Sequence, residues 1–328
     1  MTDMWQGRTC LVTGGAGFGG SHLVAELVER GARVTVIDRE PIEGKPLEDM
    51  GVEDAITFVL GDLRDGALTK ELVGAGGFDV VFHLAADPIV INSIRDPEAV
   101  VDTNVRGTAT LLEAVRIAPN TPLFVNASSG AYYGDNFDPA PIPETQEPGP
   151  ASNLYGPSKV AAEMILRGYG KAFGIPHASC RFMNTYGPGD RHESRLVPRA
   201  LSQLASGAEY DFGDRDDGST RLDFLYVGDM ARAYMSAAEH LARGGESTAF
   251  NFGTATLTSV RDVAERLSLA FDGTAREPQF RGVRTGPVRQ KRLEVSRAES
   301  VLGWTASTSL DEGLAATVAW HRAAVPAT

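Results

Sequence analysis

A tyrosine and a lysine four residues apart are the side chains of this sequence best suited to acid–base chemistry. Tyr155 and Lys159 begin a segment, from about residue 153 to 173, that we predict to be helical. Residues four apart share one helix face, so the phenol and the ammonium can serve one site. A free tyrosine titrates at about pH 10, and a nearby ammonium lowers that pKa by favouring the phenolate. Ser129 ends an apolar strand-like run and can hydrogen-bond the same substrate oxygen, so we predict that all three residues are catalytic.

A glycine-rich turn near the N-terminus favours this interpretation over a chance surface pair of tyrosine and lysine. Gly14, Gly17 and Gly20 follow an apolar run at residues 9–12 and open a helical pattern. Such a turn lets the backbone approach a pyrophosphate, and the helix N-terminus directs free N–H groups toward it. Asp38 ends the next strand, 18 residues after Gly20, where an acid binds the adenosine ribose. The pattern predicts a dinucleotide site; the alternative is a tight strand–helix turn without a ligand.

Strand-like segments alternate with helical ones through the first half of the chain. This alternation predicts a Rossmann-type doubly wound α/β fold, a parallel sheet with helices on both faces. Ligands of such sheets bind at the carboxyl ends of the strands, where the suspected residues lie. The predicted strands cover residues 9–12, 33–37, 56–60, 79–84, 123–127 and 175–182, and a helix covers 97–117.

After Asn184 the alternation loosens, and glycines and prolines signal long loops. We predict a smaller C-terminal substrate-binding lobe there, with the runs at 224–227 and 249–252 returning to the first domain. The NAD-binding domain would then comprise residues 1–182 plus about 222–254. The substrate-binding lobe would comprise about 183–221 plus 255–328.

Composition excludes several classes of protein. The 328 residues suffice for a dinucleotide domain and a second lobe, and a formal net charge of −12 argues against nucleic acid and anionic membranes as partners. We find no run of about 18 apolar residues and no apolar signal peptide, and we expect a cytoplasmic protein. Cys10 and Cys180 lie in apolar runs typical of buried thiols in a reducing compartment. The six histidines show no ligand spacing, so we predict no metal site.

Together these motifs resemble the extended short-chain dehydrogenase/reductases, and within them the NAD-dependent nucleotide-sugar epimerase/dehydratase group. The resemblance covers nearly the whole chain and implies NAD as cofactor and a nucleoside-diphosphate sugar as substrate. The segments that carry it are TGGAGFGG at 13–20, HLAA at 83–86, Asn104, Ser128-Ser129, Tyr155 with Lys159, RFMNTYGP at 181–188, RLDFLYVGD at 221–229, RTG at 284–286 and LGW at 302–304.

The resemblance also implies site residues by position. The cofactor contacts would be Gly14, Gly17, Phe18, Gly20, Asp38, Arg39, Asp62, Leu63, Leu84, Ala85, Ala86, Asn104, Tyr155 and Lys159. The substrate contacts would be Asn184, Arg221 and Arg284 at the diphosphate and Leu196 and Val197 at the base. In an acidic protein, scattered arginines are well suited to a dianionic diphosphate; the alternative is that they are solvated surface charges. Asn184 could instead be a turn residue.

Three positions depart from the group's pattern. Gly19 replaces a bulky aliphatic residue in the glycine turn, which could loosen the helix start. Pro287 replaces an acid after the 284–286 segment. Gly130 and Ala131 follow Ser129 where the group's 4,6-dehydratases carry acids, and the glutamate that its decarboxylases tend to have nearby is also missing.

These features predict an NAD-dependent nucleotide-sugar epimerase that acts at C4 through a transient 4-keto sugar. The alternatives are a nucleotide-sugar oxidoreductase or 4-ketoreductase, a decarboxylase of the same fold, and a non-catalytic NAD-binding protein. We also predict a homodimer, because the helices at 97–117 and 153–173 carry apolar residues on more than one face. Those residues include Leu111, Leu112, Met164, Ile165 and Leu166.

Overall fold

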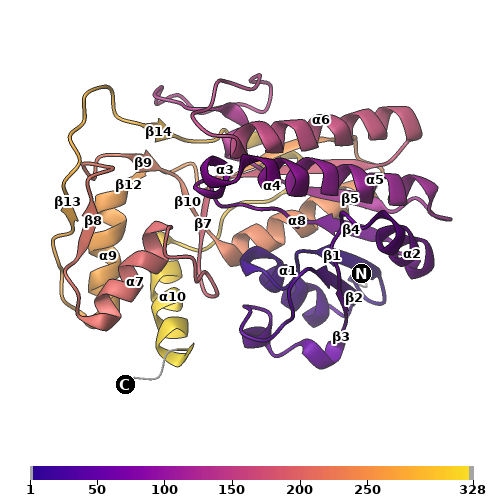
Figure 1. Cartoon of the computed structure of the whole chain (residues 1–328), viewed down its shortest axis with the longest axis horizontal. Helices are drawn as coiled ribbons and strands as arrows, with labels where there is room; N and C mark the ends of the chain where they lie inside the picture. Colours follow the sequence, from indigo (N-terminus) through magenta and orange to yellow (C-terminus); the bar gives the residue numbers. More distant parts are fainter. Residues whose placement is uncertain (1–2, 325–328) are drawn as a thin grey trace.

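The computed structural model describes residues 3–324 and is built on a seven-stranded parallel sheet with helices on both faces (Figure 1). The strand order is β3-β2-β1-β4-β5-β6-β11, so the chain starts in the middle and extends the sheet first to one edge and then to the other. This is the predicted Rossmann-type doubly wound fold. The strands are β1 (Thr9–Thr13), β2 (Arg33–Asp38), β3 (Ile56–Leu60), β4 (Val80–His83), β5 (Leu123–Ser129), β6 (His177–Phe182) and β11 (Thr248–Phe252).

Helices cover the two faces of the sheet in separate groups. On one face α1 (Phe18–Glu29) packs against α8 (Val227–Ala242), and on the other α5 (Gly107–Ile117) lies between α2 (Gly66–Gly76) and α6 (Tyr155–Phe173). Strand β1 shows why both layers are needed, because Cys10 and Val12 join the core on the α1 side while Leu11 joins the core on the α5 side.

The segment predicted as one helix at 97–117 has three parts. It consists of α4 (Pro97–Val101), a π-helical turn at Asp102–Arg106 and α5, and the short α3 (Asn92–Arg95) precedes it. Further short helical turns are Glu48–Met50, Glu53–Ala55 and Gly130–Tyr133 (3₁₀) and Ala298–Leu302 (π).

A smaller lobe with its own apolar core stands beside the carboxyl ends of the strands (Figure 1). Its helices are α7 (Leu196–Ser206), α9 (Val260–Asp272) and α10 (Leu310–Ala324), which pack on one another through α9. Its short strands are β7 (Asn184–Tyr186), β8 (Asp211–Gly213), β9 (Arg221–Leu222), β10 (Phe224–Tyr226), β12 (Thr258–Ser259), β13 (Gln279–Phe280) and β14 (Gln290–Lys291).

One predicted strand lies elsewhere than expected. The run at 224–227 does not return to the main sheet, because β10 pairs in parallel with β7. The helix α8 that follows does return and packs on α1. Cys10 and Cys180 are buried free thiols, as predicted. Within residues 3–324, no helix is both long and apolar enough to cross a membrane.

Candidate active site

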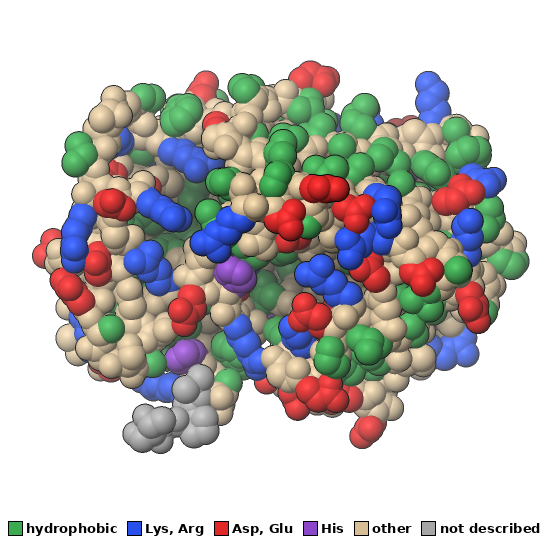
Figure 2. Space-filling view, in the orientation of Figure 1, with side chains coloured by type: hydrophobic (Ala, Val, Ile, Leu, Met, Phe, Trp, Pro, Cys, Tyr) green, Lys and Arg blue, Asp and Glu red, His purple; other side chains and the backbone are tan. Residues whose placement is uncertain are grey.

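A cleft of about 910 Å³ runs along the carboxyl ends of the central strands and continues between the sheet and the smaller lobe. Figure 2 shows the surface hollowed between the two lobes, with Lys and Arg side chains around the hollow. The structure brings almost all predicted site residues to this one cleft. Those lining it are Gly14, Gly17, Phe18, Gly20, Asp38, Arg39, Asp62, Leu63, Leu84, Ala85, Ala86, Ser129, Tyr155, Lys159, Asn184, Leu196 and Val197.

The glycine turn is packed too tightly for side chains. Gly14 has a φ of +69°, and a Cβ there would lie 2.8 Å from Cα of Ala85 at the end of β4. A Cβ on Gly20 would lie 2.2 Å from the carbonyl oxygen of Gly14. The first turn of α1 has no side-chain cap at Gly17, so its N–H groups face the cleft unshielded. This cradle fits the pyrophosphate of a dinucleotide.

The departure at Gly19 is compensated from another helix. A Cβ on Gly19 would lie 2.5 Å from Cε of Met230 in α8. The methionine therefore occupies the space where the group usually has a bulky aliphatic side chain, and the start of α1 is not loosened.

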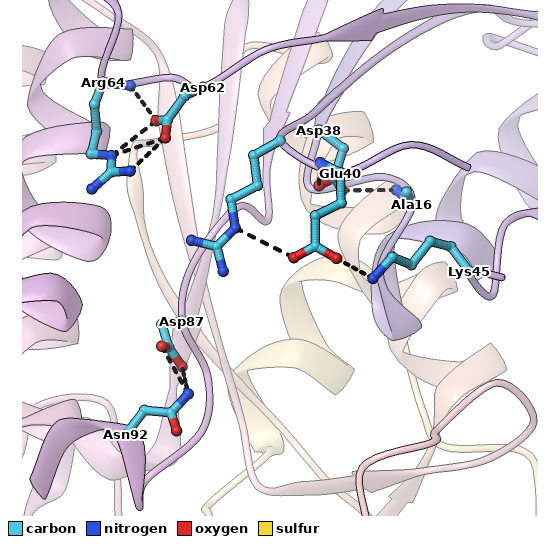
Figure 3. A network of polar contacts seen from close by, with 9 residues as sticks. Ala16, Asp38, Glu40, Lys45, Asp62, Arg64, Asp87 and Asn92 are labelled. Atoms are coloured by element: carbon cyan, nitrogen blue, oxygen red, sulfur yellow. Dashed lines mark hydrogen bonds and ion pairs between the residues drawn. The ribbon is translucent and has the colours of Figure 1, made fainter. Parts of the chain in front are cut away.

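The end of β2 presents acidic groups to the cleft (Figure 3). Asp38 accepts a hydrogen bond from the backbone N–H of Ala16 at 3.2 Å, which fixes it beside the glycine turn. Burial raises the pKa of Asp38, and backbone hydrogen bonds oppose that shift. The guanidinium of Arg39 lies 3.8 Å from the carboxylate of Glu40, which also pairs with Lys45. The positive charge of Arg39 is thus partly neutralised next to the carboxylate of Asp38.

The three predicted catalytic residues meet at the end of β5. Asn153 accepts hydrogen bonds from the backbone N–H groups of Tyr155 and Gly156, which starts α6 with the tyrosine in its first turn. Ser129 ends β5 and lies close enough to Tyr155 to affect the pKa of its phenol. Lys159, one turn further along α6, donates from Nζ to the carbonyl oxygen of Ala127 at 3.0 Å.

Burial, and not the expected effect of the lysine, sets the direction of the tyrosine pKa in this structure. Burial raises the pKa of Tyr155, and the Ser129 hydroxyl and Arg195 oppose that shift only in part. Burial also lowers the pKa of Lys159 to about 8. The ammonium is directed to a carbonyl of β5 and does not pair with the phenol. A phenolate at neutral pH therefore requires a further positive charge in the cleft, such as that of an oxidised nicotinamide ring.

Asn104 is not in the cleft lining and does not contact the cofactor space. Its side chain is buried and fully engaged: it accepts from the backbone N–H of Asp87 at 2.7 Å and donates to the Asp87 carbonyl and to the Ser158 hydroxyl. Its position is therefore below the cleft, where it fixes the loop after β4 against α6. A direct contact with the cofactor stays a prediction.

The two predicted diphosphate arginines also lie outside the cleft lining. Arg221 is exposed on β9, while the next residue, Leu222, lines the cleft. Side chains alternate along a strand, so Arg221 and Leu222 point to opposite sides of β9. The leucine faces the cleft, where the prediction had placed the arginine. Arg284 is exposed and pairs at 3.1 Å with Asp217 on the surface.

Other cations are present in the cleft instead. Arg195, Arg215, Arg289 and Lys291 line the substrate side of the cleft. Arg289 precedes β14 and Lys291 ends it, a spacing of two that places both on the same side of an extended chain. The alternation from 289 to 291 was the one signal in the sequence that could have identified them.

Beneath the predicted catalytic residues lies a buried polar layer. Glu163 of α6 and Arg181 of β6 form an ion pair in which both side chains are at most 2% exposed. Glu163 also accepts a hydrogen bond from Ser128, the neighbour of Ser129, at 2.8 Å. Arg181 lies over the ring of Tyr132 and donates to the hydroxyl of Tyr133 at 2.7 Å. The layer joins α6, β5 and β6 where they hold the site.

Comparison with known proteins identifies the family. The model of the NAD dependent epimerase/dehydratase family matches residues 10–253. The UDP-glucose 4-epimerase of Mycolicibacterium smegmatis is 36% identical over 317 residues, covering 95% of this chain and 98% of that protein. A dTDP-glucose 4,6-dehydratase of Xanthomonas campestris is 32% identical over 333 residues, covering 95% of this chain and 93% of that protein. Among solved structures, the UDP-glucose 4-epimerase of Thermotoga maritima with UDP-glucose has a TM-score of 0.86 at 32% identity, covering 97% of this chain and 99% of that one. The chain therefore belongs to the NAD-dependent epimerase/dehydratase family, and its cofactor is NAD.

Proposed function

We propose that this protein is a 4-epimerase of a nucleoside-diphosphate sugar. The observation that carries the proposal is that Ser129, Tyr155 and the glycine cradle share one cleft whose far side carries cations for a diphosphate. Tyr155 takes the proton of the C4 hydroxyl and later returns it, while Ser129 hydrogen-bonds the same oxygen. NAD, when bound, accepts a hydride from C4 and returns it to the other face of the sugar.

Contacts at the adenosine end of the cleft support a cofactor that stays bound between turnovers, as epimerisation requires. The segment after β2 is tied to the smaller lobe, because Arg191 pairs with Asp49 at 2.6 Å. Trp320 of α10 donates to the same carboxylate at 3.3 Å. A net oxidoreductase must exchange its cofactor in every cycle, so purified protein that shows the absorbance of bound cofactor would favour the epimerase over that alternative.

Dehydration across C5 and C6 is the activity of a related protein, and we predict that this chain lacks it. The reaction needs a base at C5 and an acid for the C6 hydroxyl in addition to hydride transfer. Gly130 and Ala131 carry no titratable group, and Tyr132 and Tyr133 are buried outside the cleft lining. Lys291 supplies one titratable group beside Gly130, where dehydration would need two.

One experiment tests both the proposed reaction and this absence. The protein and NAD are incubated with UDP-, dTDP-, GDP- and CDP-sugars, both hexoses and hexuronates, and products are followed by proton NMR. We expect the C4 epimer of at least one sugar and no other product. A new C6 methyl doublet from a 4-keto-6-deoxy sugar would contradict the prediction, and conversion of none of the sugars would contradict the proposed function.

We predict that NADH binds at least about 10-fold more tightly than NADPH. The 2′-phosphate of NADPH would lie against the carboxylate of Asp38, and juxtaposed like charges are strongly unfavourable. Arg39 offers little compensation because Glu40 lies beside it. Fluorescence titration of both reduced cofactors gives the ratio, and Asp38→Asn should reduce it. The exposed Asp54→Asn serves as the control, and tighter binding of NADPH by the native protein would refute the prediction.

The structure changes the basis for the predicted homodimer. Leu111, Leu112 and Leu166 are buried in the protein's own core and need no partner. Apolar side chains nevertheless remain exposed on α4, α5 and α6, on the side where Figure 2 shows hydrophobic groups over these helices. The most exposed are Val101, Ile117, Met164 and Phe173.

We propose that these helices pair two subunits. Light scattering at micromolar concentration should give about twice the monomer mass of 34.9 kDa, and Met164→Glu should shift the population toward monomer. Lys171→Gln, which makes the same change in net charge at an exposed polar position of α6, is the control. A monomer mass for the native protein would rule the dimer out. We also propose a cytoplasmic location, supported by the buried free thiols Cys10 and Cys180.

A further inference from the structure

Lys291 is a buried cation in the substrate side of the cleft that neither the family's motifs nor the proposed reaction uses. Lys291 is only 6% exposed and lines the cleft. Its place is set by β14, where Lys291 pairs in parallel with Leu222 of β9, another residue of the cleft lining. The side chain crosses to the loop that follows β5 and catalytic Ser129.

The ammonium of Lys291 is only partly satisfied by the protein. Nζ donates to the carbonyl oxygen of Gly130 at 3.0 Å and to that of Gly134. An ammonium has three N–H donors, so one remains available on a group that borders the cleft. Within residues 3–324, no carboxylate lies within ion-pair distance of it. Burial and Arg289 lower the pKa of Lys291 to about 8 while Asp135 opposes the shift, so the group is mainly protonated at neutral pH.

A buried positive charge of this kind is stabilised by an anionic partner. The cleft offers the substrate as that partner. Two anionic groups are conceivable on a nucleotide sugar, the diphosphate at C1 and a carboxylate at C6, and the position of Lys291 distinguishes them.

Lys291 lies at the reacting end of the sugar. Its Nζ contacts Gly130, which directly follows Ser129, and the C4 oxygen must lie beside Ser129 and Tyr155 for the proposed reaction. On a hexopyranose ring, C5 with its C6 substituent is the neighbour of C4, whereas C1 with the diphosphate is across the ring. Arg289, which directly precedes β14, also lines the cleft, and its guanidinium pairs with Asp135 at 3.4 Å.

We propose that Lys291 makes the cleft selective for a nucleoside-diphosphate hexuronate, a sugar whose C6 is a carboxylate, over the neutral hexose. This inference rests on the proposed function, because it takes the position of C4 from the 4-epimerase reaction. The neutral substituent at C6 of a hexose would leave the charge of Lys291 without a counter-ion.

The test is equilibrium binding to the NAD-loaded protein. UDP-glucuronate, UDP-glucose and UDP are titrated by calorimetry into the native protein and into Lys291→Gln, whose amide can still donate to the Gly130 and Gly134 carbonyls. For the native protein we expect UDP-glucuronate to bind about 10- to 100-fold more tightly than UDP-glucose, the range of a hydrogen bond between charged groups. In Lys291→Gln the two should bind within about threefold of each other, with UDP and UDP-glucose nearly unaffected.

Controls separate this contact from other roles of the same residues. Arg289→Gln removes the neighbouring cation, which is exposed and paired with Asp135, and should leave the preference for UDP-glucuronate intact. An unchanged thermal midpoint of Lys291→Gln would show that the turn is preserved. Equal binding of the two sugars by the native protein would overturn the inference. So would a loss of UDP binding in Lys291→Gln, which would assign the lysine to the diphosphate. Epimerisation of each sugar is measured separately by NMR: absence of any turnover would overturn the proposed function, while the binding ratio would still decide the role of Lys291.

Discussion

Tyr155→Phe is expected to lower kcat by about 100-fold or more while leaving NAD binding and stability nearly unchanged. The substitution removes one hydroxyl from the only predicted acid–base group, and loss of such a group typically reduces the rate by about 10²–10⁴-fold. The ring still fits the first turn of α6, which is held by the backbone contacts of Asn153 and not by the hydroxyl. Steady-state kinetics with the epimerised sugar and a titration of NAD measure the two effects.

Tyr169→Phe is the matched control, because it removes the same hydroxyl from the same helix. Tyr169 lies outside the cleft lining, and its hydroxyl donates to Glu113 at 3.4 Å. The activity of Tyr169→Phe should be unchanged. If Tyr155→Phe retained nearly full activity, the assignment of Tyr155 as the acid–base group would be wrong.

Glu163→Gln should destabilise the protein by about 3–5 kcal/mol, the typical loss when one partner of a buried ion pair is removed. The change leaves the guanidinium of Arg181 charged in an environment where it is 2% exposed. It also weakens the acceptor for the Ser128 hydroxyl, so activity should fall in the remaining folded protein. Urea unfolding followed by circular dichroism gives the change in the free energy of unfolding.

The exposed pair of Arg266 and Asp311 provides the control. Its atoms lie 3.1 Å apart, but the side chains are 51% and 70% exposed. Arg266→Gln should therefore change the free energy of unfolding by no more than about 1 kcal/mol. Equal effects of Glu163→Gln and Arg266→Gln would show that the buried pair contributes no more than a surface pair does.

The fold, and the gathering of most predicted cofactor residues at one cleft, could be predicted from the sequence for a physical reason. Strands that are buried on both faces and a turn that admits only glycine leave strong local patterns, and Gly14, Asp38 and Tyr155 all lie at strand or helix ends that those patterns define. Parallel topology then brings these ends to one edge. The position of β10 was predicted wrongly, because an apolar run of this kind is equally compatible with pairing to the main sheet and with pairing to β7.

The substrate side was harder to predict because its residues come from two-residue strands and loops. Arg221 and Leu222 differ by one position, and only the pairing of β9 with β14 and β12 decides which of them faces the cleft. The hydrogen bonds of Asn104 to Asp87 and Ser158 could not be predicted either, because these partners are distant in the sequence. The local sequence marks Lys291 only by its two-residue spacing from Arg289, since its contact with Gly130 joins segments separated by 161 positions.

The fate of the hydrogen at C4 tests the central claim most directly. UDP-glucuronate and UDP-glucose labelled with deuterium at C4 are incubated with the NAD-loaded protein in ordinary water, and the C4 epimer is analysed by NMR and mass spectrometry. A 4-epimerase that works through a transient 4-keto sugar and a retained cofactor returns the same atom, so we predict a product that keeps its deuterium at C4. Loss of deuterium from C4 of the epimer, or release of a keto sugar with stoichiometric NADH, would contradict the account.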